Sequence, residues 1–103
     1  MAQAEGLNIE NENLLNFLLY RSLHRGCKET DILLGEFAKT EISKMPEVEL
    51  RNYKNLLEEQ DWDIYAWLLS DSANIKVPEA YINIIEIIRA FWARKNANGS
   101  SNI

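Results

Sequence analysis

The sequence predicts an all-α protein folded as a compact five-helix bundle. Three observations lead to this prediction. Apolar residues recur at spacings of three and four in five separate segments, as one face of a helix requires. Glycine, proline or a capping residue punctuates the chain between these segments. No pair of alternating segments joined by a turn signal indicates a β-hairpin.

The first predicted helix begins near Glu10–Asn13, where an asparagine can cap it. Arg21 and Arg25 are four residues apart, so we expect them on the same side of its last turn. Gly26 follows, where a left-handed helix stop is easiest. The apolar face comprises Leu14, Leu15, Leu18, Leu19 and Leu23, with Phe17 beside them.

The second predicted helix runs from about Lys28 to Ser43. Glu29 and Asp31 fall in its first turn, where acidic side chains complement the helix dipole. Gly35 in its middle costs about 1 kcal/mol relative to alanine, which indicates either close approach of another helix or a tolerated loss. Its expected inner face is Leu34, Phe37, Ala38, Ile42 and Met45.

Three further helices are predicted in residues 46–59, 62–70 and 78–95, with Asp61 capping the second of these and a loop at 71–77. Proline opens the first and the last of the three. The residues expected to face inward are Leu50, Tyr53, Leu56, Leu57, Ile64, Trp67, Leu68, Tyr81, Ile84, Ile85, Ile88, Phe91 and Trp92. We predict a disordered segment at 1–10, one helical domain at 11–95 and a flexible tail at 96–103.

Composition and charge exclude several classes of function. The net charge of −5 is opposite in sign to the basic surface with which proteins bind nucleic acids. The sequence contains no run of 18 apolar residues, so we predict no segment that spans a membrane. A single cysteine fits a reducing compartment. Residues 1–13 resemble neither a secretory signal nor a transit peptide. We therefore expect a cytoplasmic protein of bacterial type, or one that has already been processed. We also expect it to be a monomer when free.

No residue pattern predicts a catalytic or metal centre. One histidine and one cysteine cannot build a zinc site, and the acidic pairs lack the spacing of a calcium loop. His24 and Cys27 are three apart, but no orienting third group is evident for a nucleophile pair. The glycines are scattered and form no phosphate-binding loop. The aromatic residues Trp62, Tyr65, Trp67, Tyr81, Phe91 and Trp92 are better explained by core packing than by a ligand groove.

The segment from Arg25 to Asp31 has two compatible interpretations. Basic residues before a glycine and acidic residues after it are what any helix–helix corner can use. The same residues also form a basic cluster with Arg21, His24 and Lys28 in a chain of net charge −5. A confined patch of opposite sign is typical of a specific protein docking site.

The motif Arg25-Gly26-Cys27-Lys28-Glu29 resembles the RGxxE motif of the SdhE-type flavinylation factors, the succinate dehydrogenase assembly factor 2 family. Arg21 and Asp31 stand where the longer form of that motif expects them. Residues 56–68 resemble the family's second signature, LLE-x-x-D-x-D-L-x-x-W-L. The resemblance covers residues 12–95. It departs from the family at Trp62, where proline is common, and in the longer stretch at 69–79.

This resemblance implies an assembly factor, not an enzyme, that promotes covalent attachment of FAD to a histidine of the flavoprotein subunit of succinate dehydrogenase, and often of fumarate reductase. By the same resemblance, Arg25, Gly26 and Glu29 form the surface that contacts this client, supported by Arg21 and Asp31. FAD is held by or delivered to the client, so no stably bound cofactor is expected. Chemical participation in the reaction stays open. The alternative, suggested by the broad apolar face of the fifth predicted helix, is a helical adaptor or regulator unrelated to flavin.

Overall fold

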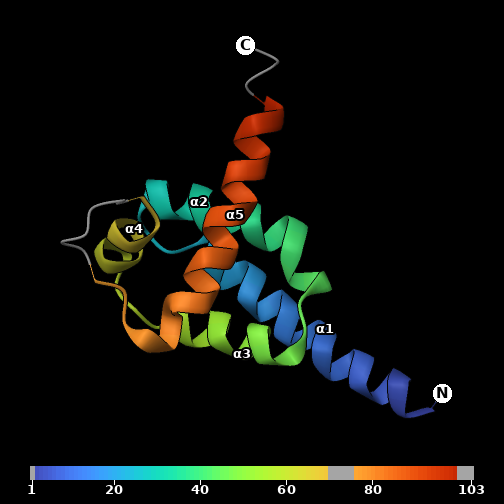
Figure 1. Cartoon of the computed structure of the whole chain (residues 1–103). Helices are drawn as coiled ribbons and strands as arrows, with labels where there is room; N and C mark the ends of the chain where they lie inside the picture. The colour runs from blue at the N-terminus through green and yellow to red at the C-terminus, as the bar shows by residue number, and fades with distance from the viewer. Residues whose placement is uncertain (1, 70–75, 100–103) are drawn as a thin grey trace. The chain divides into compact units, whose positions relative to one another are not determined.

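A computed structural model describes residues 2–69 and 76–99, with side chains described at 12–69 and 76–97. Within these ranges the regular structure consists of five α-helices and two 3-10 helices, with no strand (Figure 1). The prediction of an all-α fold with five helices is confirmed. The chain divides into two units, Met1–Met45 and Pro46–Ile103, which are described in turn.

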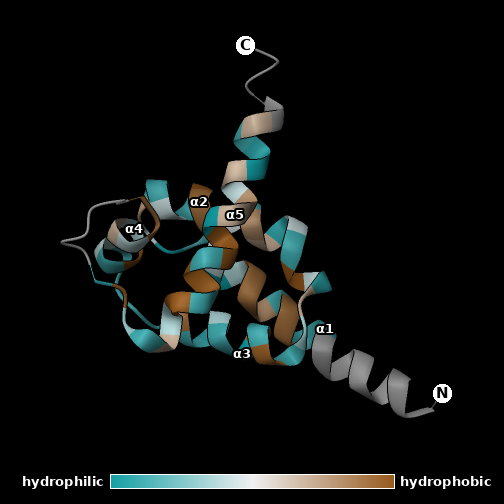
Figure 2. Ribbon diagram, in the orientation of Figure 1, coloured by the Kyte–Doolittle hydropathy of each residue, from teal (hydrophilic) through white to brown (hydrophobic). Residues whose placement is uncertain are grey.

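The first unit is a helical hairpin of α1 (Ala2–Leu23) and α2 (Lys28–Glu41), followed by η1 (Ile42–Lys44) (Figure 1). Hydrophobic and hydrophilic residues alternate along the chain of α2, because an amphipathic helix has one face of each kind (Figure 2). The buried side chains of this unit are Leu18, Ser22, Thr30, Leu34, Phe37, Ala38 and Ile42.

Helix α1 begins at Ala2, well before the predicted start at Glu10–Asn13. Residues 2–13 contain no proline that would interrupt a helix, so the asparagines do not act as a start signal. The predicted disordered segment at 1–10 therefore overlaps a helix in the structure. The limits of the predicted helical domain stay a prediction.

Gly35 marks the point of closest approach between α1 and α2. A Cβ atom placed on Gly35 would lie 2.6 Å from Leu23 Cδ2 and 3.5 Å from Leu23 Cγ. Of the two explanations that the sequence left open for a mid-helix glycine, close approach of another helix is therefore the correct one. The missing side chain is what lets Leu23 pack against the backbone of α2.

In the second unit, α3 (Glu47–Leu56) starts one residue after Pro46, which occupies the N-cap position. Proline suits this end of a helix because its missing N–H would have no partner there. Helix α4 (Asp61–Leu69) includes Asp61 as its first residue, where the sequence predicted a cap. The residues predicted to face inward are buried in both helices and at Leu57, the C-cap of α3: Leu50, Tyr53, Leu56, Leu57, Ile64, Trp67 and Leu68.

The last segment differs from its prediction at both ends. It opens with η2 (Glu79–Tyr81) and continues as α5 (Ile82–Gly99), so α5 runs past the predicted end at Lys95. Residues 96–98 contain no proline, and the helix ends at a glycine, a common stop. Most of the predicted loop at 71–77, and the end of the predicted tail, lie outside the described residues. The buried residues of α5 are Ile84, Ile85, Ile88 and Phe91.

Two side chains fasten the helices of the second unit to one another. Arg89 of α5 donates from Nε and Nη2 to the Trp67 carbonyl, at 3.1 and 2.5 Å. This contact satisfies a carbonyl in the last turn of α4 that has no partner within the helix. The Tyr81 hydroxyl donates to Glu59 Oε2 at 2.5 Å, and its ring lies 5.6 Å from that of Trp67. No helix of the described ranges is long and apolar enough to cross a membrane.

The contact between Gly35 and Leu23 predicts energetic coupling between these two positions. Gly35→Ala gains up to about 1 kcal/mol of helix propensity, but its Cβ must displace the Leu23 side chain. We expect Gly35→Ala to be more favourable in the Leu23→Ala background than in the wild-type background, by on the order of 1 kcal/mol. Urea unfolding of the four proteins measures this coupling. A Gly35→Ala effect that is the same in both backgrounds would contradict the close approach.

The contact between Tyr81 and Glu59 predicts a loss of stability at alkaline pH. The hydrogen bond to the Glu59 carboxylate, with burial and the charges of Glu59 and Glu58, raises the pKa of Tyr81 from 10.0 to about 12. Because the folded-state pKa is raised, the stabilisation is fully present below pH 10 and is lost as the pH rises toward 12. The stability difference between wild type and Tyr81→Phe, about 1 kcal/mol at pH 8, should therefore shrink across this range. A pH-independent difference in urea unfolding would refute this account.

Candidate functional site

The α1–α2 corner, defined as residues 24–31, turns the chain at Gly26. The last backbone hydrogen bond of α1 runs from His24 N–H to Tyr20 O, at 3.0 Å. Gly26 then adopts a φ of 95°, and no other described residue has a positive φ. Glycine reaches this region without the steric penalty of a Cβ atom. The predicted left-handed stop at Gly26 is confirmed.

Asp31 braces the corner through the main chain. Its Oδ1 accepts a hydrogen bond from the Arg25 N–H at 2.6 Å, which ties the start of the turn to the first turn of α2. Its own N–H donates to Cys27 O at 2.8 Å. The Thr30 hydroxyl donates to the same carbonyl at 3.1 Å, and Thr30 is fully buried. Asp31 therefore has a structural role in the corner.

Arg21 and Arg25 do not share a helix face, contrary to the prediction. Helix α1 ends at Leu23, so Arg25 lies in the connection and follows the path of the turn. Arg21 stays on the last turn of α1, with its Cζ atom 5.7 Å from the centre of the Phe17 ring. Both arginines are half-exposed. The structure thus brings Arg25 to Asp31 and leaves Arg21 stacked on its own helix.

The outer surface of the corner is open around Gly26. Gly26, Lys28 and Glu29 are exposed, and nothing lies within 4 Å of a Cβ atom built on Gly26. The Cys27 thiol donates to Glu29 Oε1 at 3.4 Å, which holds this carboxylate beside the start of α2. A partner's main chain can therefore approach Gly26 closely, between the basic side of the corner and Glu29.

The structure gives His24 and Cys27 separate partners. The His24 ring lies 4.5 Å from the Tyr20 ring, at an interplanar angle of 35°. The Cys27 thiol is directed to the Glu29 carboxylate. This arrangement lends no support to a nucleophile pair, which requires the base to hydrogen-bond the nucleophile.

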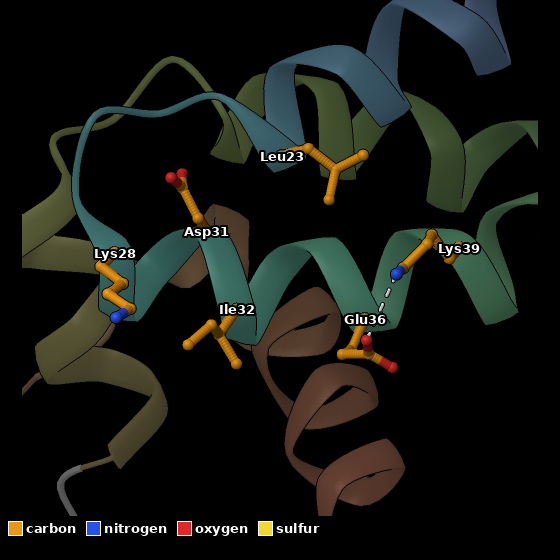
Figure 3. A pocket seen from close by; sticks show the side chains of 6 residues that line it. All are labelled: Leu23, Lys28, Asp31, Ile32, Glu36 and Lys39. Atoms are coloured by element: carbon orange, nitrogen blue, oxygen red, sulfur yellow. Dashed lines mark ion pairs between the residues drawn. The ribbon is translucent and has the colours of Figure 1, made fainter.

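A shallow hollow of about 250 Å³ adjoins the corner on the side of α2 (Figure 3). Leu23 points from the end of α1 toward α2, while the Asp31 carboxylate points toward the connecting loop (Figure 3). At the far end, Lys39 Nζ and Glu36 Oε2 form an ion pair at 3.3 Å. The lining residues are Leu23, Lys28, Asp31, Ile32, Glu36 and Lys39. The hollow is smaller than the usual ~300–1,000 Å³ of small-molecule sites.

Sequence reasoning missed two residues that shape the corner. Thr30 was not singled out, although it stands four residues before Leu34 and so continues the buried face of α2. Cys27 was assigned no role, yet it is the N-cap of α2 and supplies the carbonyl that Thr30 and Asp31 bind. The spacing could have revealed Thr30; nothing in the sequence distinguishes Cys27.

The aromatic residues of the second unit only partly follow the predicted core packing. Trp67 and Phe91 are buried, whereas Trp62 is 74% exposed and contacts Tyr65 edge-on at 6.1 Å. No group of three or more histidine, cysteine, aspartate or glutamate side chains in the described part of the chain is placed to hold a metal ion.

Comparison with known proteins places the chain in a family. Residues 16–92 match the family Sdh5, described as "Flavinator of succinate dehydrogenase". The chain is 44% identical over 66 residues to "Succinate dehydrogenase assembly factor 2, mitochondrial" of Saccharomyces cerevisiae, covering 64% of this chain and 41% of that protein. It is 44% identical over 72 residues to the protein of the same name from Dictyostelium discoideum, covering 70% and 49%.

A third relative of that name, from Schizosaccharomyces japonicus, is 38% identical over 90 residues, covering 84% of this chain and 61% of the relative. The chain thus spans less than two thirds of the length of these relatives. The family match covers most of the chain and includes both the α1–α2 corner and α4. The chain belongs to the family of flavinators of succinate dehydrogenase.

Proposed function

We propose that this protein promotes covalent attachment of FAD to a histidine of the flavoprotein subunit of succinate dehydrogenase. It does so by binding that subunit through the α1–α2 corner, with Arg25, Gly26 and Glu29 in contact and Arg21 and Asp31 in support. Membership of the flavinator family and the names of the relatives support the client and the task.

The observation that carries the proposed contact is the open main chain at Gly26. A residue with positive φ, no side chain and no neighbour above it stands between an arginine and an exposed glutamate. At such a site the backbone of a partner can approach closely, and the opposite charges of the arginine and the glutamate can fix the position of that partner. The brace from Asp31 to the Arg25 N–H holds the turn in this shape before the partner arrives.

Binding alone is sufficient to accelerate the attachment. A client held with its flavin and its acceptor histidine aligned reacts in an effectively unimolecular step, and such orientation is worth up to about 7–11 kcal/mol in favourable cases. In this mechanism the residues of the corner orient the client and transfer no proton. In this proposal FAD stays with the client.

Client range and cellular location stay predictions. Fumarate reductase is a second expected client through the same surface. The relatives are named as mitochondrial proteins, whereas the sequence predicted a cytoplasmic protein of bacterial type. The alternative function, a helical adaptor unrelated to flavin, is not favoured, because the family match points to succinate dehydrogenase.

The first test replaces Arg25, whose side chain is not what braces the turn. We expect Arg25→Ala to lower covalent flavin in a co-expressed flavoprotein subunit by about tenfold at limiting assembly factor, which corresponds to a loss of about 1.4 kcal/mol of binding. The Arg25 N–H remains available to Asp31 in this variant, so the fold should be preserved. Flavin fluorescence of the denatured client in a gel is the readout.

Arg51→Ala is the matched control. Arg51 is an exposed arginine of α3, paired with Glu47 at 3.0 Å, and exposed pairs contribute little to stability. The control should support flavinylation like the wild type. If the client carries as much covalent flavin without any assembly factor as with the wild-type protein, the proposed function is refuted. Loss with both arginine variants would refute the assignment to the corner.

The second test replaces Gly26 and should affect the fold and the client together. With open space around its Cβ atom, Gly26→Ala suffers only the backbone strain of a positive φ, about 1–2 kcal/mol. The added methyl group also obstructs the partner's approach, so flavinylation should fall even at temperatures where the variant is folded. Thermal unfolding by circular dichroism and the gel assay measure the two effects. Unchanged stability would contradict the strained turn.

A further inference from the structure

The last two turns of α1 expose a row of aromatic and basic side chains. Phe17 is 43% exposed and Tyr20 is 62% exposed, although both are large and apolar. Arg21 and His24 follow at spacings of three and four, so the four residues share one helix face. This face, named here the α1 strip, consists of Phe17, Tyr20, Arg21 and His24, and its last residue is also the first residue of the α1–α2 corner.

The side chains of the α1 strip are ordered in pairs. The Arg21 guanidinium lies 5.7 Å from the centre of the Phe17 ring, within the range of a cation–π contact. The Tyr20 and His24 rings are 4.5 Å apart. Each aromatic ring is therefore held by a neighbour one turn away. A surface ordered in this way loses less conformational entropy when a partner binds.

Isolated exposed apolar residues are common and need no function. Val48, 66% exposed on α3, is one of them. The α1 strip differs because two large aromatic residues occur together and tyrosine and arginine are enriched among the residues that dominate binding energy. Arg25 and Lys28 follow it along the chain, so aromatic rings and positive charges are neighbours in the sequence of a chain of net charge −5.

We propose that the α1 strip is a second part of the client contact, and that it binds an acidic patch with exposed apolar side chains on the flavoprotein subunit. This inference rests on the proposed function. The strip and the corner carry Arg21, Arg25 and Lys28 against Glu29 and Asp31, a net charge of +1 with His24 neutral, which favours an acidic partner surface over a basic one. The aromatic rings supply the apolar area that a charge contact alone lacks, because burial of apolar surface is the main favourable term in association.

The test measures the affinity of the full chain for the purified flavoprotein subunit by titration calorimetry. The double variant Phe17→Ala/Tyr20→Ala should bind at least tenfold more weakly than the wild type. Val48→Ala, the matched control for loss of an exposed apolar side chain, should bind within twofold of the wild type. Thermal unfolding should show that the double variant is folded, since alanine is the best helix former and both residues are exposed.

Two single variants test the sign of the partner's charge and do not depend on the double variant folding. With an acidic partner, Tyr20→Glu should weaken binding more than Tyr20→Lys, and the difference should shrink at 0.5 M salt. A larger loss with Tyr20→Lys would overturn the acidic partner surface.

The remaining outcomes separate this inference from the proposed function. Wild-type binding that is weakened by Arg25→Ala but not by Phe17→Ala/Tyr20→Ala would overturn the α1 strip and leave the proposed function standing. Absence of wild-type binding would overturn both. If sedimentation shows that the double substitution abolishes self-association while client affinity is unchanged, the strip binds a second copy of the chain and the inference is wrong.

Discussion

The hydrogen bond from the Arg25 N–H to Asp31 Oδ1 is the constraint on which the candidate site depends. A chain that leaves α1 at Leu23 and re-enters a helix at Lys28 has four residues in which to reverse direction. Gly26 supplies the positive φ that this reversal needs, and Asp31 closes the turn from the other side. Without the carboxylate, the Arg25 N–H would lose its partner in a half-buried position, at a cost of about 1–3 kcal/mol.

The hairpin formed by this turn explains why residues that are far apart in the sequence lie in contact. Because the two helices run back along each other, Leu23 comes to lie over Gly35, twelve residues further along the chain. The buried hydroxyls of Ser22 and Thr30 are satisfied locally, by Leu18 O at 2.6 Å and by Cys27 O at 3.1 Å. Both bonds stay near the α1–α2 turn, so this end of the hairpin buries polar groups without leaving them unpaired.

Much of the fold follows from helical periodicity. The buried apolar side chains of α2, α3 and α4 were predicted because their spacing of three and four admits one interpretation. Helix ends were less predictable. Residues 2–13 include asparagines that can cap a helix, yet α1 passes through them, so a possible capping residue alone does not fix where a helix begins. Pro46 and Pro78 were placed correctly as breaks, but the first turn after Pro78 is a 3-10 turn, which periodicity does not distinguish.

The sequence singled out the residues of the α1–α2 corner but not the hydrogen bonds between them. The positive φ of Gly26 followed from its position after a helical segment. The partnership of Asp31 with a main-chain N–H, instead of with an arginine side chain, requires the path of the turn, which no spacing encodes. The exposure of Phe17 and Tyr20 was also not predicted. Both residues lie next to the apolar face of α1, and the sequence does not show that their side chains point to solvent.

Because Asp31 binds the main chain at position 25, the shape of the turn does not depend on the side chain at that position. Since Asp31 binds the backbone of residue 25, any residue except proline at that position can donate the same hydrogen bond. The side chains at positions 25 and 29 can then change without altering the turn that presents them. Under the proposed function, a library varied at these two positions would sample new client preferences on an unchanged turn, so the corner is a starting point for redirecting the protein to other flavoproteins.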